Sequence, residues 1–363
     1  MNILVQLGHP AHFHLYKNTI LQLKDKGHTI HVIIKTKDIL EDLCAKSGIK
    51  YINLLPEGRK DSKLGVFVGM LKRDWRIYNY VRKNNIDLLT GSAVEIAHVG
   101  KLLGIPSIFM GEDDASIVKL FCIMTFPFVT EIIQPKVCNG GKWENRAIKY
   151  SGYQKLAYLH PNRFTPSKET IPQINFDKPY YIIRLVSLAA YHDTNRNGVS
   201  GKVLDELIEK LLTQGTVYIS SEKPLPENLN QYRLPIDISY IHHALYFADL
   251  YIGDSQSMAV ESAILGVPNI RYNDFIGQIG VLEELEHVYG LTKGIPTNNK
   301  KLLFEYIDTI LANPNSKSEF QEKRKRMLTE KIDVTAFMVW FLENYPESAR
   351  IMKENPDYQL KFK

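Results

Sequence analysis

The 363-residue sequence has few cysteines and no long apolar run. Its three cysteines, Cys44, Cys122 and Cys138, are an odd number without CxxC spacing, which argues against both a disulfide framework and a zinc site. No apolar stretch approaches the roughly 20 residues that span a bilayer. The first residues lack the basic flank and apolar stretch of a secretory signal, so we expect a cytoplasmic protein.

The sequence also lacks internal repeats, low-complexity tracts and the common nucleic-acid-binding motifs. Its net charge of +5 and pI near 8.8 favour anionic partners, but lysine and arginine are spread along the chain. We therefore expect no nucleic-acid partner. A nucleotide, a phosphate group or a membrane surface would each suit this charge balance.

Short apolar segments alternate with amphipathic ones along both halves of the chain, which predicts an α/β protein with parallel sheets covered by helices. Strands are expected at residues 2–7, 29–36, 50–54, 86–92, 106–110, 131–135, 148–152, 180–185, 216–221, 249–253 and 268–272. Helices are expected at residues 13–26, 38–46, 63–83, 94–103 and 202–213, with an apolar helix near 241–247.

The pattern divides the chain into two similar α/β domains, residues 1–155 and 178–330. Residues 152–178 are rich in proline and polar residues and are expected to be a linker. A single helical stretch is predicted from 316 to 345, and the tail 331–363 is expected to pack back on the first domain. Ligands of such sheets bind beyond the carboxyl ends of the strands, so a cleft between the two domains is the expected site.

The segment 253–269, GDSQSMAVESAILGVPN, is the most informative part of the sequence. It predicts a buried strand that opens through Gly253 into a helix, whose first N–H groups would form an anion site. Ser255 and Ser257 add hydroxyl groups, and Glu261 follows Ser257 by one helical turn, where it could accept the hydroxyls of a ribose. The alternative is an ordinary capped helix after a buried strand.

His9, His12 and His14 lie in the turn after the first predicted strand. No cysteine or carboxylate accompanies them and His12 and His14 are two residues apart, so a metal site is not expected. A histidine has the pKa of a general base at neutral pH, although any of the three could instead be a helix cap.

Further candidates lie where other predicted strands end. Arg184 could hold a phosphate through two hydrogen bonds or form a surface salt bridge. Tyr240 and Ile241 could contact a base or sugar, with core packing the alternative for Ile241. The acidic turn that contains Glu112 and Asp113 could orient an acceptor, or could simply be solvated.

The segment 63–83 combines aromatic, aliphatic and basic residues at helical spacing. It could lie on an anionic membrane surface or receive a lipid-linked acceptor, and it could equally bury one face in the core.

The segments NILVQLGHPAHFHLYKN, IIRLVSLAAYHD and FADLYIGDSQSMAVESAILGVP resemble the GT-B superfamily of nucleotide-sugar enzymes, and most closely a prokaryotic family of unknown function, number 354. The last segment is also similar to the donor-binding segment of the peptidoglycan N-acetylglucosaminyltransferase. The resemblance implies two Rossmann-like domains that face a central cleft. It implies that Glu261 binds the ribose and that His12 is the acceptor base or a donor contact. The residues implied to bind the donor are Arg184, Tyr240, Ile241, Gly253, Asp254, Ser255, Gln256, Ser257, Met258 and Glu261.

We therefore predict a metal-independent glycosyltransferase without a cofactor, whose substrate is a nucleotide-diphosphate sugar that this resemblance implies to be UDP-linked. It would act on a glycan or lipid-linked acceptor in surface polysaccharide assembly, with His12 and His9 as catalytic candidates and His14, Glu112 and Asp113 near the acceptor. A peripheral contact with the inner face of the membrane is part of this hypothesis. The alternatives are a non-hydrolysing UDP-sugar 2-epimerase, which Glu112, Asp113 and Asp114 would suit, and a non-catalytic nucleotide-sugar-binding protein.

Overall fold

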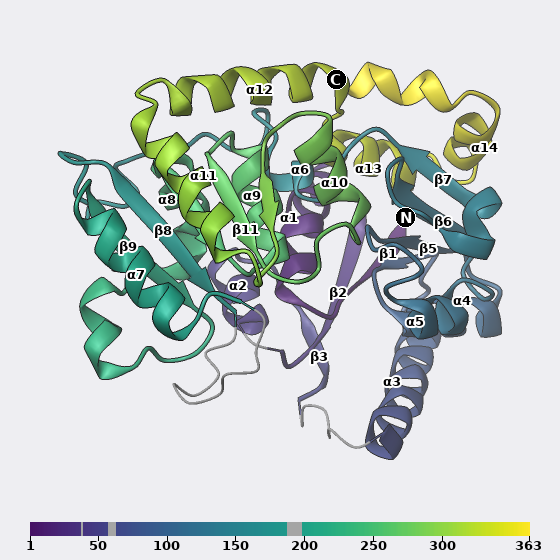
Figure 1. Cartoon of the computed structure of the whole chain (residues 1–363). Helices are drawn as coiled ribbons and strands as arrows, with labels where there is room; N and C mark the ends of the chain where they lie inside the picture. Colours follow the sequence, from purple (N-terminus) through teal and green to yellow (C-terminus); the bar gives the residue numbers. More distant parts are fainter. Residues whose placement is uncertain (38, 57–62, 187–197) are drawn as a thin grey trace. The chain divides into compact units, whose positions relative to one another are not determined.

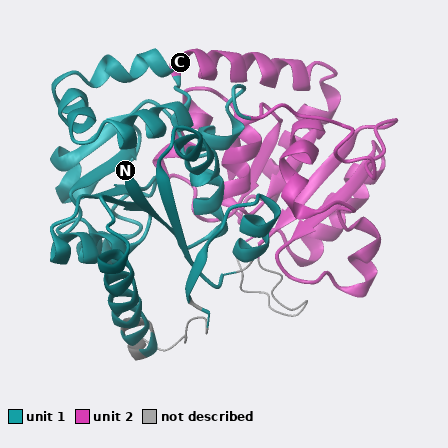
Figure 2. Cartoon of the chain, turned by 180° about the vertical axis from the view of Figure 1, so that it is seen from behind, with its two compact units in different colours: residues 1–163, 331–363 teal, residues 164–330 magenta. Residues whose placement is uncertain are grey.

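The computed structural model describes residues 1–37, 39–56, 63–186 and 198–363. It divides into two compact units (Figure 2): unit 1 comprises residues 1–163 and 331–363, and unit 2 comprises residues 164–330. Each unit contains one parallel sheet with helices packed on it (Figure 1). The predicted α/β fold of two Rossmann-like halves is therefore confirmed.

The sheet of unit 1 has seven parallel strands in the order β3-β2-β1-β4-β5-β6-β7. Their bounds are β1 Asn2–Leu7, β2 Thr29–Lys35, β3 Ile52–Leu55, β4 Leu88–Gly91, β5 Ser107–Met110, β6 Glu131–Pro135 and β7 Ala147–Tyr150. The central strands are continuous apolar runs because helices cover both of their faces.

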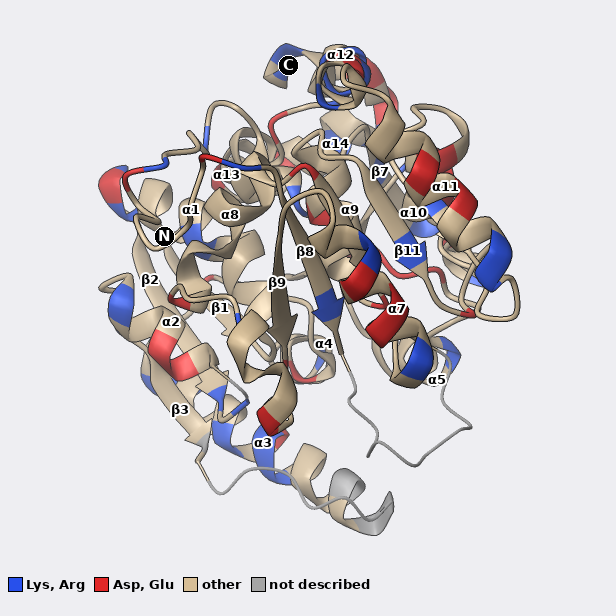
Figure 3. Ribbon diagram, turned by 60° about the vertical axis from the view of Figure 1, so that its left-hand side comes forward, with Lys and Arg blue, Asp and Glu red and all other residues tan. Residues whose placement is uncertain are grey.

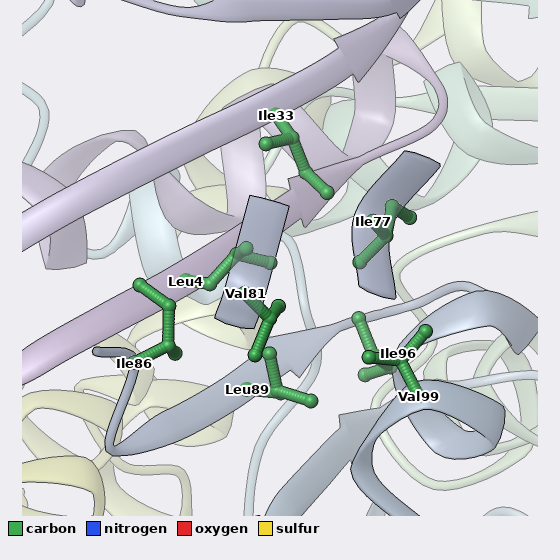
Figure 4. Packing of buried hydrophobic residues seen from close by; sticks show 8 residues of the cluster. All are labelled: Leu4, Ile33, Ile77, Val81, Ile86, Leu89, Ile96 and Val99. Atoms are coloured by element: carbon green, nitrogen blue, oxygen red, sulfur yellow. The ribbon is translucent and has the colours of Figure 1, made fainter. Parts of the chain in front are cut away.

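The helices of unit 1 form two groups. α1 packs against α2, α6 and α13, whereas α3 packs against α4 and α4 against α5. Their bounds are α1 Pro10–Asp25, α2 Leu40–Lys46, α3 Lys63–Lys83, α4 Val94–Leu103, α5 Lys119–Thr125, α6 Leu156–Leu159, α13 Val334–Glu343 and α14 Glu347–Glu354, with 3-10 helices η1 Gly141–Arg146 and η4 Pro356–Phe362. Figure 4 shows the core in which Ile77 and Val81 of α3 meet Leu4 of β1 and Leu89 of β4.

The sheet of unit 2 has five parallel strands in the order β12-β11-β10-β8-β9. Their bounds are β8 Tyr180–Leu185, β9 Thr216–Ser221, β10 Leu250–Gly253, β11 Asn269–Tyr272 and β12 Lys293–Ile295. The helices are α7 Gly201–Leu212, α8 Ile241–Phe247, α9 Gln256–Ile264, α10 Gly280–His287, α11 Lys300–Ala312 and α12 Ser316–Glu330, with 3-10 helices η2 Glu227–Tyr232 and η3 Ile238–Tyr240. α9 packs against α8 and α10 and contacts β10 and β11.

Two expectations about the chain path were wrong. The single helix expected over 316–345 is broken between α12 and α13, because the Asp333 side chain accepts a hydrogen bond from Ala336 N (3.0 Å) and starts a new helix. Asp333 also forms an ion pair with Arg163 (2.7 Å). The region expected to be a linker contains α6, whose buried Leu156 and Leu159 belong to the core of unit 1.

Candidate functional site

The turn after β10 brings the backbone of unit 2 into a very tight space. A Cβ atom at Gly253 would lie 2.6 Å from the Tyr251 hydroxyl oxygen and 2.9 Å from Arg184 Cβ. Only glycine therefore fits where β10 ends and the chain turns into α9.

Ser255 caps α9 and leaves part of the helix N-terminus available. Its Oγ accepts a hydrogen bond from Met258 N (3.3 Å), and its carbonyl oxygen accepts one from Ala259 N (3.1 Å). Within the described parts of the chain, the N–H groups of Gln256 and Ser257 have no acceptor. Ser257 is exposed and Gln256 is partly exposed, so an anion could reach these two donors.

Asp254 connects three loops at this end of the sheet. Its carboxylate accepts a hydrogen bond from Val186 N (2.9 Å), and its carbonyl oxygen accepts one from Asn273 Nδ2 (3.1 Å). Burial raises the pKa of Asp254 from 3.8 to about 6. Asp254 therefore braces the turn. Asn273 shares this role and is fully buried. No local pattern in the sequence pointed to it.

Five residues lie in one register across the sheet of unit 2 and share one face: Ser220, Arg184, Gly253, Arg271 and Gly294. Gly253 therefore separates two arginine residues near the carboxyl ends of the strands. The position of Arg271 was missed because its neighbours come from strands distant in the sequence.

Arg184 is already held by the protein. Its Nη1 donates to Ser220 Oγ (2.9 Å) and its Nη2 lies 3.0 Å from Glu222 Oε1. Its Nε is buried and has no hydrogen-bond partner in the part of the chain that the structure describes. A phosphate that binds Arg184 through two hydrogen bonds, as predicted, would have to share the guanidinium with Glu222.

Arg271 is completely buried, and its guanidinium lies 3.6 Å from Glu283 and 3.5 Å from Glu286. Burial lowers its pKa, and the two carboxylates oppose that shift. None of its three guanidinium nitrogens has a hydrogen-bond partner among the described residues. Arg271 thus anchors α10 under the sheet.

Glu261 is buried and lies 3.2 Å from Nε2 of His242, which is also buried. A ribose that binds Glu261 would meet a carboxylate already engaged with His242. At the start of α8, the capping residue Tyr240 is 44% exposed whereas Ile241, the first residue of the helix, is packed in the core. The burial of Ile241 therefore favours the alternative of core packing.

In unit 1, His9 and His12 use the same ring nitrogen in the turn from β1 to α1. Nδ1 of His9 accepts from Ala11 N (3.2 Å), and Nδ1 of His12 accepts from Gly8 N (3.2 Å). The two ring centres are 6.1 Å apart. His14 lies apart from them and contacts Tyr158 of α6, with 5.1 Å between the ring centres.

The surroundings of His12 are positively charged. Burial lowers its pKa, and together with the neighbouring His9, Lys35 and Lys155 it brings the pKa from 6.5 to about 3. Lys35 is the last residue of β2, and Lys155 comes shortly before α6. His12 is therefore neutral at physiological pH.

The acidic turn after β5 is largely tied into the fold. Glu112 forms an ion pair with Lys155 and accepts from Gln154 N (2.8 Å). Asp114 accepts from Asn139 N (2.6 Å). Burial and the charge of Asp114 raise the pKa of Asp113.

The described residues contain neither a membrane-spanning helix nor a metal-binding group. No helix there is long and apolar enough to cross a membrane. In the same residues no three His, Cys, Asp or Glu side chains form a group that could hold a metal ion. Residues 187–193, part of one segment used for the superfamily resemblance, lie outside the described ranges.

Solved structures similar to this chain share the GT-B fold. Staphylococcus aureus MnaA with UDP has a TM-score of 0.70 at 11% identity, covering 96% of this chain and 97% of MnaA. A UDP-GlcNAc 2-epimerase from Neisseria meningitidis bound to UDP-GlcNAc has a TM-score of 0.66 at 14% identity, covering 94% of this chain and 100% of the epimerase chain. MurG of Acinetobacter baumannii has a TM-score of 0.57 at 14% identity, covering 94% of this chain and 99% of the MurG chain. The chain is thus a GT-B-type protein with two Rossmann-like domains.

The profile of the family described as "Protein of unknown function (DUF354)" matches residues 1–279. This match covers more than half of the chain, so the protein belongs to the DUF354 family. No curated protein matches the sequence.

Proposed function

We propose that this protein is a GT-B glycosyltransferase that moves a sugar from a nucleotide-diphosphate donor to a glycan or lipid-linked acceptor in surface polysaccharide assembly. The observation that carries the proposal is the N-terminus of α9, where Gln256 and Ser257 offer two backbone N–H groups beyond a glycine turn. Structural neighbours that contain UDP or UDP-GlcNAc support a uridine nucleotide as the first candidate.

In the proposed reaction, the helix N-terminus receives the diphosphate and stabilises the negative charge that grows on it as the sugar leaves. Arg184, the register partner of Gly253 on the neighbouring strand β8, adds a positive charge to the same end of the sheet. This arrangement needs no metal ion for charge stabilisation. Glu261, one helical turn beyond Ser257, would bind the ribose hydroxyls while it remains beside His242.

The test is UDP binding measured by calorimetry on the wild-type protein and Ser257→Glu. A carboxylate in the first turn of α9 stabilises the helix but repels a diphosphate, so we expect at least a tenfold loss of UDP affinity without loss of stability. Ser318→Glu is the matched control, because Ser318 is exposed in the first turn of α12 in the same unit. Equal UDP affinity of Ser257→Glu and the wild type would refute the diphosphate site.

A UDP-sugar 2-epimerase is the second candidate, because solved epimerases are among the structural neighbours. Incubation with UDP-GlcNAc alone separates the two reactions. An epimerised sugar, detected by proton NMR without an acceptor, would establish the epimerase. A donor that stays intact until an acceptor glycan is added supports transfer. UDP-GlcNAc binding without turnover under either condition would support a non-catalytic binding protein.

We also propose that unit 1 contacts the cytoplasmic face of an anionic membrane. α3 carries six basic residues and one acidic residue, and blue segments of its ribbon in Figure 3 mark basic positions. On the same helix, Val68, Leu71 and Trp75 recur every three to four residues and are 54%, 49% and 68% exposed. His98 of α4 connects this helix to α5, since it contacts Asp74 (2.9 Å) and the carbonyl oxygen of Met124 (2.9 Å).

Vesicle sedimentation tests this contact. We expect binding to phosphatidylglycerol vesicles that weakens with salt, and little binding to phosphatidylcholine vesicles. Trp75→Glu should abolish most of the binding, whereas Leu212→Glu, at an exposed leucine of unit 2, should not. Equal losses in the two variants would argue against α3 as the contact.

A further inference from the structure

The hydrogen bond between Gly8 and His12 fixes which nitrogen of the His12 ring carries the proton. Gly8 N–H can only donate, and it donates to Nδ1 of His12 at 3.2 Å. Nδ1 must therefore present a lone pair, and a neutral imidazole with an unprotonated Nδ1 carries its proton on Nε2.

A base at this position would have to take a proton on the nitrogen that Gly8 occupies. Nε2 already holds a proton, so protonation must occur at Nδ1 and would break the hydrogen bond from Gly8. The resulting imidazolium would also face the positive side chains of Lys35 from β2 and Lys155 from the segment before α6, next to His9 of the same turn. These charges oppose proton uptake, which agrees with the lowered pKa of His12.

We propose that His12 serves the reaction as a neutral hydrogen-bond donor through Nε2–H, and not as the base that deprotonates the acceptor. This inference rests on the proposed function, because it assigns a role within sugar transfer. The hydrogen bond from Nε2–H transfers no proton. It stabilises an oxygen that is negatively charged or becomes so, such as that of an anionic group of the acceptor.

Within the described residues, Nε2 of His12 has no acceptor in the protein. His12 is partly exposed and lies in the first turn of α1, directly after β1. The donor is thus held in one orientation by the backbone before a ligand arrives. Such a fixed donor needs little rearrangement during the reaction.

The first experiment reads the tautomer directly and needs no substrate. The full chain is labelled with nitrogen-15 in its histidines, and the His12 signals are assigned by their loss in His12→Ala. We expect a protonated Nε2 and an unprotonated Nδ1 that stay unchanged between pH 8 and pH 5. A protonated Nδ1, or titration of the ring within this range, overturns the proposal.

The second experiment measures turnover of UDP-GlcNAc, by whichever reaction the protein catalyses, in His12→Gln and His12→Ala. Glutamine keeps an N–H donor but cannot act as a base. We expect His12→Ala to lose roughly 10- to 100-fold in kcat, with His12→Gln recovering most of this loss. Equal losses in both variants, with unfolding temperatures like that of the wild type, would show that proton transfer is the role of His12.

The two experiments separate this proposal from the proposed function. If UDP does not bind at all, the diphosphate site fails while the ring tautomer is still measured. If UDP binds and Ser257→Glu weakens it, but the His12 ring titrates near neutral pH, only the donor role fails.

Discussion

The turn from β1 to α1 in unit 1 and the turn from β10 to α9 in unit 2 each follow an inner strand of a parallel sheet, yet they use their backbone amides in opposite ways. In the first turn, Pro10 has no N–H and the His9 side chain accepts from Ala11 N. The His9 carbonyl oxygen accepts from His12 N (2.9 Å) and Phe13 N (3.3 Å). The protein itself therefore occupies the amides that begin α1.

In the second turn, the single Ser255 cap engages Met258 N and leaves the amides before it available. The first turn thus presents the ring N–H of His12, whereas the second presents backbone N–H groups of Gln256 and Ser257. The fold sets the place of both turns. The residue at the cap decides which kind of donor remains for a ligand.

The largest effect that the comparison predicts comes from one substitution made in both turns. Gly253→Ala should lower the free energy of unfolding of unit 2 by about 1–3 kcal/mol and weaken UDP binding, because the new Cβ would meet Tyr251 Oη at 2.6 Å. Gly8→Ala should have little effect on stability, since its Cβ would meet nothing closer than 3.5 Å. Urea unfolding and UDP calorimetry measure both variants.

A similar loss of stability in Gly8→Ala and Gly253→Ala would remove the contrast between the two turns. It would mean that the first turn is as tightly packed as the second.

The sequence was sufficient for the strands because their apolar runs and flanking glycines are local signals. It was also sufficient for the strand, the glycine turn and the capped helix at 253–258, since strand, glycine and serine cap are consecutive. The break before α13 had a readable signal as well: Asp333 precedes the apolar segment VTAF, which is typical of a helix cap.

The remaining features depend on contacts between distant segments. Arg271 and Asn273 gain their roles from strands and loops that meet only in the folded unit. The His242 partner of Glu261 and the Lys155 partner of Glu112 are likewise distant in sequence. β12 has only three residues and no apolar run, so periodicity could not detect it.

A smaller effect is expected from the ionisation of Asp254. The turn from β1 to α1 has no corresponding carboxylate at its cap. Its folded pKa of about 6 exceeds the unfolded value of 3.8. The folded protein thus holds a proton that the unfolded chain has released, and this stabilises the fold at low pH. The contribution is lost as the pH rises through 6.

Asp254→Asn removes this dependence and keeps an oxygen that can accept from Val186 N. We expect the free energy of unfolding of the variant, relative to the wild type, to rise by about 1–2 kcal/mol between pH 4 and pH 7 and then level off. Urea unfolding at several pH values measures it. A difference that is constant with pH would show that Asp254 ionises in the folded protein as it does in the unfolded chain.

The smallest effect concerns the two caps themselves. Ser255→Ala and His9→Ala each remove the side chain that accepts from the first turn of a helix, so each should destabilise its unit by about 1 kcal/mol. Their effects on UDP should differ: Ser255→Ala should weaken binding through disorder of the α9 N-terminus, and His9→Ala should leave it unchanged. If His9→Ala weakened UDP binding as much as Ser255→Ala, the nucleotide would depend on both turns. The assignment of the diphosphate to unit 2 alone would then be wrong.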